Sequence, residues 1–383
     1  MVQYDFPTII LSGVGSLKEF AKRLKGKKHE KILIVTDGRL VEIGLIQELS
    51  SLLASEGIGF DLFSDVHPNP VEEDIEIGLQ AYISGGCDSI IGFGGGSPID
   101  AAKVIKLMAA NPPPLKQYED RLGGSELVKG PMPALYAIPT TAGTGSEVGR
   151  SGVIISKETG QKTIFFHPEF MPHIAVLDPE LTVGLPPHLT AATGVDALVH
   201  CIEAYLATGF HPMADGIALQ GIELALEWLP RAVADGSDLR ARERMQLAAA
   251  MGATAFQKGL GIVHSLAHPL SSMCATHHGL ANALMLPETM KYLEQGSHSR
   301  QNTARISKIL SIFEERKIAG SGLAESCKDF IMSLGIEMGL AKHGVEEADT
   351  KQLSRCAFLD TCHVSSMAAV SESILLDIYT SSL

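Results

Sequence analysis

Short apolar runs alternate with amphipathic segments over roughly the first 185 residues. The runs are rich in β-branched residues and end in Gly, Asp or Pro, which is typical of buried strands. Between them, apolar positions recur at helical spacing, with acids in a first turn and glycines at an end. A βαβ alternation of this kind predicts a parallel, doubly wound sheet. The expected strands include 31–37, 60–66 and 88–96, and the expected helices include 17–24, 40–57, 71–86 and 94–110.

The pattern changes after LDPELTVGLPP. From about residue 188 strand signals nearly vanish, and long Ala- and Leu-rich segments with helical periodicity follow one another to the end. We therefore expect an α/β domain over 1–186 and an all-helical domain over 187–383. Before the boundary, the stretches on either side of KETGQ predict a hairpin.

The helical half carries ligand-type residues at helical spacing. Asp196 and His200 are four apart, as are His264 and His268, and His278 follows directly before a glycine. Residues four apart share one face of a helix. Ordinary polar helix positions are the alternative, but residues of this kind are seldom buried without partners. Imidazole with a carboxylate suits Fe²⁺ or Zn²⁺.

Two loops of the α/β half could bind a nucleotide. In GGGSPIDAAKVIKLMAA (94–110), glycines follow a strand and precede a helix, where backbone N–H groups can hold a phosphate. The spacing is not the GxGxxG fingerprint, and a plain strand-to-helix turn is the alternative. In YAIPTTAGTGSEVGR (136–150), threonine and serine hydroxyls lie among small residues. With the ligands in one half and these loops in the other, we expect the site in a cleft between the domains.

Composition narrows the function classes. The net charge of −13 and the absence of a basic patch argue against nucleic acid as a partner. No apolar run reaches the roughly 18 residues of a membrane span, and the N-terminus lacks the pattern of a secretory signal. The 6 cysteines form no CxxC pair. These features predict a cytoplasmic protein with reduced core thiols.

Together the motifs GGGSPID, PTTAGTGSEV, GVDALVH and HSLAHPL…HHGLANALMLP resemble the iron-containing (group III) alcohol dehydrogenase family. The resemblance covers nearly the whole chain. It implies a Rossmann-like N-terminal domain, a helical C-terminal domain, a bound divalent metal (Fe²⁺, with Zn²⁺ as the other candidate), NAD as cofactor and a homo-oligomer such as a dimer. It also implies a small alcohol or aldehyde as substrate.

The resemblance also assigns roles to residues. His268 would lie beside the nicotinamide and substrate and take part in a proton relay. The metal ligands would be Asp196, His200, His264 and His278. The cofactor would contact Asp37 at the adenosine ribose, Gly95, Gly96 and Ser97 at the pyrophosphate, Thr140, Thr141 and Thr144 at the adenosine and phosphates, and Lys162 at the nicotinamide ribose.

The chain departs from the family pattern in three places. HVSSMAA (363–369) stands where the family usually carries Asn-Pro-Arg, AFQKGLG (255–261) is one residue short and carries Lys258, and Ser151 with Gly152 replaces bulkier residues. A cation beside a roomier pocket would favour a substrate with a carboxylate at its far end. The alternative is a solvent-facing or helix-ending lysine.

Three activities remain open at this point. The leading interpretation is an NAD- and metal-dependent alcohol dehydrogenase or aldehyde reductase. A polyol or hydroxyacid dehydrogenase, such as one acting on 4-hydroxybutyrate, is the nearest alternative. A metal-dependent hydrolase or lyase is further away, because such an enzyme needs no dinucleotide site, and a non-catalytic metal-binding protein would leave the hydroxyl-rich loop unexplained.

Overall fold

The structure is a computed structural model of the 383-residue chain. It describes residue 6, residues 9–27, 29–296, 300–318 and 320–383. These residues form two compact units, which divide between Val183 and Gly184. The first, the α/β unit, holds Phe6–Thr141 and Gly145–Val183; the second, the helical unit, holds Gly184–Leu383 and the short segment Ala142–Thr144.

Within its described residues, the α/β unit contains a six-stranded parallel sheet in the order β1-β8-β5-β4-β2-β3. Because βαβ crossovers put helices on its faces, such a sheet is buried on both sides. Its strands are β1 (Ile10–Ser12), β2 (Lys31–Val35), β3 (Gly59–Phe63), β4 (Ser89–Gly94), β5 (Ala134–Pro139) and β8 (Ile174–Leu177). The helices beside it are α1 (Ser16–Lys25), α2 (Gly38–Glu42), α3 (Ile46–Ser55), α4 (Glu72–Ser84) and α5 (Gly96–Ala110).

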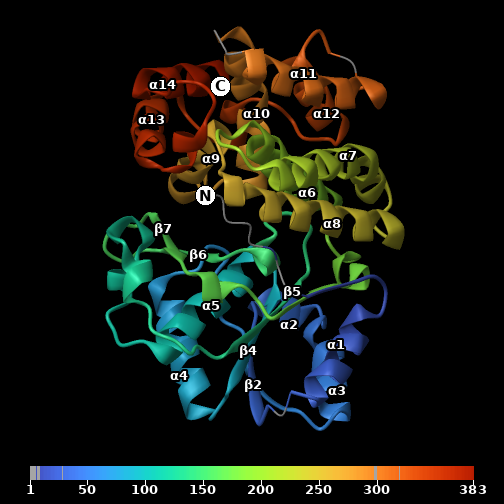
Figure 1. Cartoon of the computed structure of the whole chain (residues 1–383), viewed down its shortest axis with the longest axis vertical. Helices are drawn as coiled ribbons and strands as arrows, with labels where there is room; N and C mark the ends of the chain where they lie inside the picture. Colours follow the sequence, from blue (N-terminus) through green and yellow to red (C-terminus); the bar gives the residue numbers. More distant parts are fainter. Residues whose placement is uncertain (1–5, 7–8, 28, 297–299, 319) are drawn as a thin grey trace. The chain divides into compact units, whose positions relative to one another are not determined.

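Strand β2 shows how the sheet is covered. Ile32 and Ile34 pack in one core with residues of α1 and α3, whereas Leu33 and Val35 pack in another with residues of α4 and α5. Figure 1 shows these helix pairs on opposite sides of β2 and β4. Successive side chains of a strand point to opposite faces, so the unbroken apolar run fits a strand covered on both sides. The predicted parallel, doubly wound sheet is confirmed.

Two local features of the α/β unit concern predicted elements. The single helix expected over 40–57 is wrong: α2 and α3 are separated at Gly44, whose φ of 81° is left-handed and suits glycine. The hairpin expected around KETGQ is confirmed. It consists of β6 (Ser151–Ile155) paired antiparallel with β7 (Lys162–Phe166).

The helical unit is built on α6, a long and almost wholly buried helix. It packs beside α7 and α8 in one apolar core, which its Ala-rich sequence allows because small side chains let helices approach closely. The helices are α6 (Pro187–Leu206), α7 (Pro212–Ala234), α8 (Leu239–Ala255), α9 (Ile262–Met273), α10 (His278–Gln295), α11 (Arg300–Glu315), α12 (Leu323–Ser333), α13 (Thr350–Leu359) and α14 (Glu372–Ser381). The predicted helical C-terminal half is confirmed.

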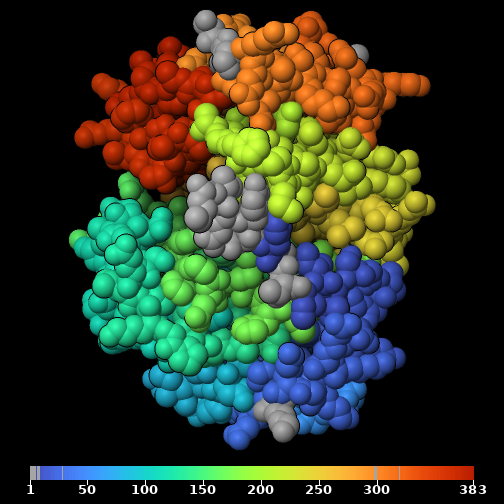
Figure 2. All heavy atoms as spheres, viewed as in Figure 1, coloured from blue at the N-terminus to red at the C-terminus, as the bar shows by residue number. Residues whose placement is uncertain are grey.

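The end of the chain belongs to the same helical core. Leu340 donates its backbone N–H to the carbonyl of Ser382 at 2.7 Å. In Figure 2 the side chains of the last helices, in red, lie against those of the preceding segment, in orange. Within the described ranges, every helix is too short or too polar to cross a membrane, and every described cysteine is a free thiol.

Two glycines on α7 test how tightly these helices pack. A Cβ on Gly221 would lie 2.4 Å from Sγ of Cys201 on α6, whereas a Cβ on Gly216 would meet nothing within 4 Å. We expect Gly221→Ala to destabilise the protein by about 1–3 kcal/mol through overpacking. We expect Gly216→Ala, on the same helix, to stabilise it by up to ~1 kcal/mol, the difference in helix propensity. Chemical denaturation of both variants measures this, and equal shifts would contradict the packing.

Candidate metal and cofactor sites

Helix α6 places a carboxylate and an imidazole on one buried face. Asp196 and His200 are one turn apart, and their residues are only 2% and 5% exposed. Their closest side-chain atoms, Oδ1 and Nε2, are 4.0 Å apart. That distance is too long for a hydrogen bond, so the two groups lie together without satisfying each other.

Two more imidazoles approach the same oxygen. Nε2 of His264, on α9, lies 3.9 Å from Oδ1 of Asp196, and Nε2 of His278, the first residue of α10, lies 3.7 Å from it. The rings of His200 and His264 stack with centroids 4.6 Å apart. Three nitrogens therefore face one carboxylate oxygen at separations suited to ligands of a shared cation rather than to hydrogen-bond partners. All four predicted ligands come together.

Burial and neighbouring carboxylates shift the pKa values of the two innermost imidazoles in opposite directions. It lowers the pKa of His200 to about 4, against the opposing pull of Asp196, so the ring is neutral at physiological pH. Burial also lowers the pKa of His264, but the hydrogen bond and charge of Glu203 outweigh it and raise that pKa. A metal ligand must be a neutral imidazole. The neutral His200 and the carboxylate of Asp196 are donors of the kind a divalent cation needs.

Two residues that the sequence analysis missed support these ligands. The carboxylate of Glu203 accepts from Nδ1 of His264 at 2.6 Å. The amide of Asn282 donates to Oδ1 of Asp196 at 2.6 Å. Both could have been found, because Glu203 lies seven residues after Asp196 on the same helix face and Asn282 lies four after His278.

His268 belongs to a neighbouring group rather than to the ligand set. Its Nδ1 is 2.7 Å from Oδ2 of Asp360, and Ser265 donates to the other oxygen of that carboxylate at 2.8 Å. Although burial opposes it, the charge and hydrogen bond of His268 hold the pKa of Asp360 well below its usual range. The ring stacks on His278 with centroids 5.4 Å apart. His268 is thus held next to the candidate ligand His278, and its predicted place beside the nicotinamide stays a prediction. Asp360 had no sequence signal, because it lies 92 residues further along.

Cys362 completes the group around Asp360. Its backbone N–H donates to Asp360 at 2.8 Å. Atoms of His268, Asp360 and Cys362 lie within 4.8 Å of one another, a spacing that a metal could also bridge. Burial raises the pKa of the Cys362 thiol well above its ordinary value. The hydrogen bonds of Asp360 to His268, Ser265 and the Cys362 backbone account for the arrangement of this cluster.

The α/β unit gathers the predicted nucleotide residues at one sheet edge. Asp37 follows β2, Gly95 and Gly96 follow β4, and Thr140 follows β5, and these strands are neighbours in the sheet. Parallel strands end at the same edge, where ligands of open α/β sheets bind. Thr141, after Thr140, lies close to Gly95, since a Cβ there would be 3.7 Å from Cγ2 of Thr141. Ser97 lies in the first turn of α5 and donates to the carbonyl of Pro68.

The strand-to-helix turn presents backbone at the start of α5. Gly94 has φ of 143°, a region that favours glycine, and a Cβ there would lie 2.8 Å from Cγ of Pro98. No side chain of the described residues caps α5 at Gly95. Backbone N–H groups at such a helix start, with the positive end of the dipole, suit an anion such as a pyrophosphate.

Other residues of the two loops have different places. Thr144 belongs to the helical unit with Gly143, which packs against Thr193 of α6. Lys162 begins β7, and its charge acts on Asp100 of α5. Ser146, one of the hydroxyls of this loop, is engaged within the α/β unit, where it donates to Asp100 at 2.5 Å and accepts from a buried lysine.

That lysine, Lys103 of α5, was also missed. Its side chain is fully buried, and Nζ donates to Ser146 and to the carbonyl of Ser151, each at 2.7 Å. Burial lowers its pKa to about 8, opposed by Asp100 and Glu147. These bonds fix the hydroxyl-rich loop and the start of β6 against α5. The spacing DAAK, on one helix face, was the available signal.

The expectation of a free cation at Lys258 is wrong. Its side chain is 2% exposed, and Nζ donates to Oδ1 of Asp215 at 2.6 Å and to the carbonyl of Tyr205 at 2.9 Å. Arg305 binds the same carboxylate through both terminal nitrogens at 3.0 and 2.7 Å. Lys258 is therefore neither available to a substrate nor solvent-facing, since a buried ammonium needs these acceptors. It does end a short 3-10 helix, Phe256–Lys258, as the helix-ending alternative predicted.

The extra room expected at Gly152 is also absent. A Cβ there would lie 2.9 Å from Cγ2 of Val104 and 3.1 Å from the carbonyl of Asp100. The space belongs to α5, against which β6 packs.

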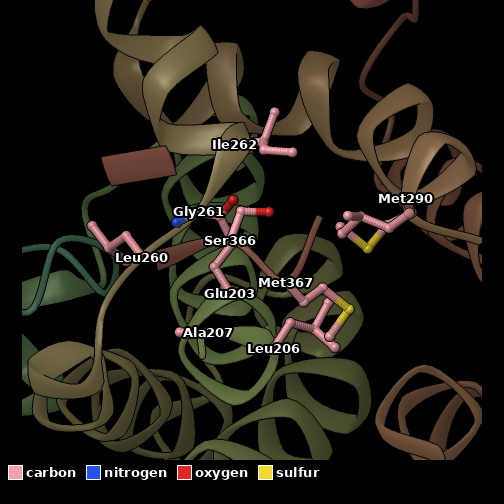
Figure 3. A pocket seen from close by; sticks show the side chains of 10 residues that line it. Glu203, Leu206, Ala207, Leu260, Gly261, Ile262, Met290, Ser366 and Met367 are labelled. Carbon is pink, nitrogen blue, oxygen red and sulfur yellow. The ribbon is translucent and has the colours of Figure 1, made fainter. Parts of the chain in front are cut away.

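The segment that stands in place of the Asn-Pro-Arg triplet lies beside Glu203. Ser366 and Met367 line a small pocket of the helical unit. Figure 3 shows Glu203 directed toward Gly261 at this pocket, with Met290 across from them. This segment therefore packs behind Glu203, the residue that holds His264.

The chain matches known proteins over its whole length. Residues 7–179 match the family model of iron-containing alcohol dehydrogenases, and residues 190–383 match the model of the C-terminal part of the same family. It is 39% identical over 338 residues to a 4-hydroxybutyrate dehydrogenase of Cupriavidus necator, covering 86% of each chain. It is 35% identical over 370 residues to an NAD-dependent methanol dehydrogenase of Bacillus methanolicus, covering 94% of each.

A solved structure shows the same fold. The crystal structure of a 1,3-propanediol oxidoreductase superposes with a TM-score of 0.92 at 33% identity, covering 100% of both chains.

The buried ion pair at Lys258 predicts a stability effect in place of a change in substrate preference. We expect Lys258→Met to lower the free energy of unfolding by about 1–3 kcal/mol, less than the ~3–5 kcal/mol of a pair left with no partner, because Arg305 still binds Asp215. Lys291→Met, which breaks an exposed pair with Glu288, should cost under about 1 kcal/mol. Denaturation midpoints compare the two, and a changed ratio of rates on 4-hydroxybutyrate and 1-butanol in Lys258→Met would contradict this assignment.

Proposed function

The chain belongs to the iron-containing alcohol dehydrogenase family, and we propose that it transfers a hydride between NAD(H) and a small alcohol or aldehyde. It is an oxidoreductase acting on alcohols, as family membership establishes. The family match gives no support to the hydrolase or lyase interpretation.

One observation carries the proposal: three imidazole nitrogens and a carboxylate oxygen converge in a buried site without hydrogen bonding to one another. Asp196, His200, His264 and His278 would hold the cation. Imidazole with one carboxylate suits Fe²⁺ and Zn²⁺ alike, and the family name favours Fe²⁺. When bound, the metal supplies a Lewis acid for the alcohol oxygen and the nicotinamide supplies the hydride acceptor.

The remaining roles in proton transfer and cofactor binding fall to residues of the chain itself. His268, held by Asp360 through Nδ1, would relay the proton of the alcohol group, since an imidazole can exchange protons near neutral pH. Gly95, Gly96 and Ser97 would bind the pyrophosphate. Thr140, Thr141 and Thr144 would bind the adenosine and phosphate groups, and Lys162 the nicotinamide ribose.

Asp37 supports NAD over NADP. It follows β2 and its carboxylate accepts from the N–H of Leu40 at 3.1 Å, capping α2. A carboxylate at this place can accept from the ribose hydroxyls and repels a 2′-phosphate. The Bacillus methanolicus relative is NAD-dependent by name.

A hydroxyacid dehydrogenase is the second candidate, favoured by the 39% identity to the 4-hydroxybutyrate dehydrogenase. Since Lys258 is committed to Asp215, that activity would need another group for the carboxylate. A panel of short alcohols, diols, aldehydes and 4-hydroxybutyrate, followed by NADH absorbance with Fe²⁺ or Zn²⁺ added back, separates the two candidates. A cytoplasmic homo-oligomer and a site between the domains stay predictions.

The metal assignment predicts how three variants differ. We expect His264→Ala and Asp196→Ala to lose bound metal and activity together while the helical circular dichroism signal persists. His268→Ala should keep its metal and lose turnover by roughly 10²-fold, the scale of general acid–base catalysis. Metal analysis of purified proteins is the test, and full occupancy in the first two variants would rule out the ligand set.

The cofactor assignment predicts the effect of changing Asp37. Wild type should prefer NADH to NADPH. In Asp37→Gly, the ratio of kcat/KM with NADH to kcat/KM with NADPH should fall by at least about tenfold, which corresponds to ~1.4 kcal/mol. Asp37→Ser should lower this ratio equally, although its hydroxyl oxygen can still cap α2. This variant therefore distinguishes the effect of the lost charge from the effect of a lost helix cap. A wild type that prefers NADPH would show that Asp37 is misplaced.

A further inference from the structure

We propose that Glu203 is a positioning residue of the metal site, which holds His264 in the one tautomer that can bind a cation. The inference rests on the proposed function, because it assumes that His264 is a metal ligand. It adds a residue outside the four ligands and explains why a carboxylate is buried among apolar side chains of α6.

The contacts of Glu203 are dense for a buried side chain. Its side chain is 3% exposed. The carboxylate accepts from Nδ1 of His264 at 2.6 Å and from the backbone N–H groups of Val263 at 2.6 Å and Gly261 at 3.0 Å. All three donors lie where α9 begins, so one carboxylate holds the start of the helix and the ring that α9 carries.

The hydrogen bond decides which ring nitrogen is protonated. A carboxylate without its proton can only accept, so Nδ1 of His264 must carry the hydrogen that it donates. In a neutral ring, Nε2 then keeps its lone pair, and it is this atom that lies 3.9 Å from Oδ1 of Asp196. A carboxylate behind a ligand imidazole is a frequent way of fixing the tautomer and ring orientation in metal sites.

Capping alone would not require this arrangement. Glu294 does the same for α12, with oxygens accepting from the N–H groups of Leu323 at 2.6 Å and Ala324 at 3.0 Å. Both of these donors are backbone groups, and Glu294 lies near the end of α10, 16 residues after His278. The chain therefore contains a glutamate that caps a helix and a glutamate that caps a helix and also holds a ligand.

The position of Glu203 on α6 links the ligand elements. Asp196, His200 and Glu203 lie at i, i+4 and i+7, on one face of a single helix. Asp196 and His200 are ligands, and Glu203 hydrogen bonds to the ligand His264. One rigid helix, α6, therefore positions three of the four ligands. The Glu203 carboxylate is closely packed against the start of α9, since a Cβ on Gly261 would lie 2.6 Å from Oε1 of Glu203.

Glu203→Gln tests the tautomer directly, because glutamine has nearly the same shape but presents an NH₂ group in place of one oxygen. If its oxygen replaces Oε1 and accepts from Val263, its NH₂ replaces Oε2 and faces Nδ1 of His264 and the N–H of Gly261. The ring must then accept at Nδ1 and protonate Nε2, which blocks the cation. If the amide turns over, its oxygen accepts from Nδ1 of His264 and from Gly261, and its NH₂ opposes the N–H of Val263 instead. The first arrangement inverts the tautomer and the second loosens the start of the helix that carries His264, so either should weaken metal binding.

The experiment measures the affinity of metal-free protein for Co²⁺ by competition with a chromophoric chelator, independently of enzyme activity. We expect Glu203→Gln to bind Co²⁺ about 10–100-fold more weakly than wild type. Glu294→Gln is the matched control: it should keep the wild-type affinity within about twofold, as expected for independent sites. Both variants should lower the unfolding midpoint of the metal-free protein, because both weaken a helix cap.

The outcomes separate the two proposals. Wild-type affinity in a folded Glu203→Gln would overturn the role of Glu203 and leave the metal site standing. A wild type that binds no Co²⁺ would overturn the metal site and this assignment with it. If Glu203→Gln does not fold, long-range ¹H–¹⁵N spectra of ¹⁵N-histidine-labelled, metal-free wild type decide, with His264→Gln to assign the signal. Protonated Nδ1 supports the proposal, and a neutral ring protonated at Nε2 overturns it.

Discussion

A buried carboxylate faced by imidazoles that do not hydrogen bond to it is the constraint on which the helical unit depends. Asp196 is 2% exposed, and the amide of Asn282 donates a hydrogen bond to it. A carboxylate taken out of water at this depth costs several kcal/mol unless it is paired. The Nε2 atoms of His200, His264 and His278 lie 3.7–4.0 Å from Oδ1 of Asp196. At these distances the nitrogens could bind one cation together with the carboxylate, but they are too far away to hydrogen bond to it.

That constraint explains the composition of the surrounding helices. The candidate ligands on α6, α9 and α10 can converge only if these helices lie close together, and the small residues between them allow it. Gly279, next to His278, would place a Cβ 2.3 Å from the carbonyl oxygen of Ala192 on α6. Gly252 of α8 would place one 2.9 Å from Cβ of His200. Bulkier residues at these positions would move the helices that carry the ligands, so here the apolar packing and the polar site depend on each other.

Sequence patterns predicted the periodic features and missed the long-range ones. The apolar run of β2 and the spacing of Asp196 and His200 report local geometry, so the parallel sheet and the ligand face could be read directly. The break at Gly44 was missed because one left-handed glycine interrupts an otherwise helical pattern. Asp360 and Asp215 were missed because a hydrogen bond across many residues leaves no periodic trace. The error at Lys258 has the same origin: its partners Asp215 and Tyr205 come from α7 and α6, and neither is near it in sequence.

The two units offer a charged group different kinds of binding atoms. The α/β unit uses backbone: glycines after β4 and an uncapped start of α5 present N–H groups, and Lys103 fixes the neighbouring loop from behind. Backbone donors fit a phosphate, which carries its own charge and many acceptor oxygens. The helical unit offers side chains, because a divalent cation needs lone pairs and the backbone carbonyls inside a helix already accept hydrogen bonds within it. Side chains can rotate where backbone cannot, so a site made of them needs further residues such as Glu203 and Asn282 to hold each ligand in place.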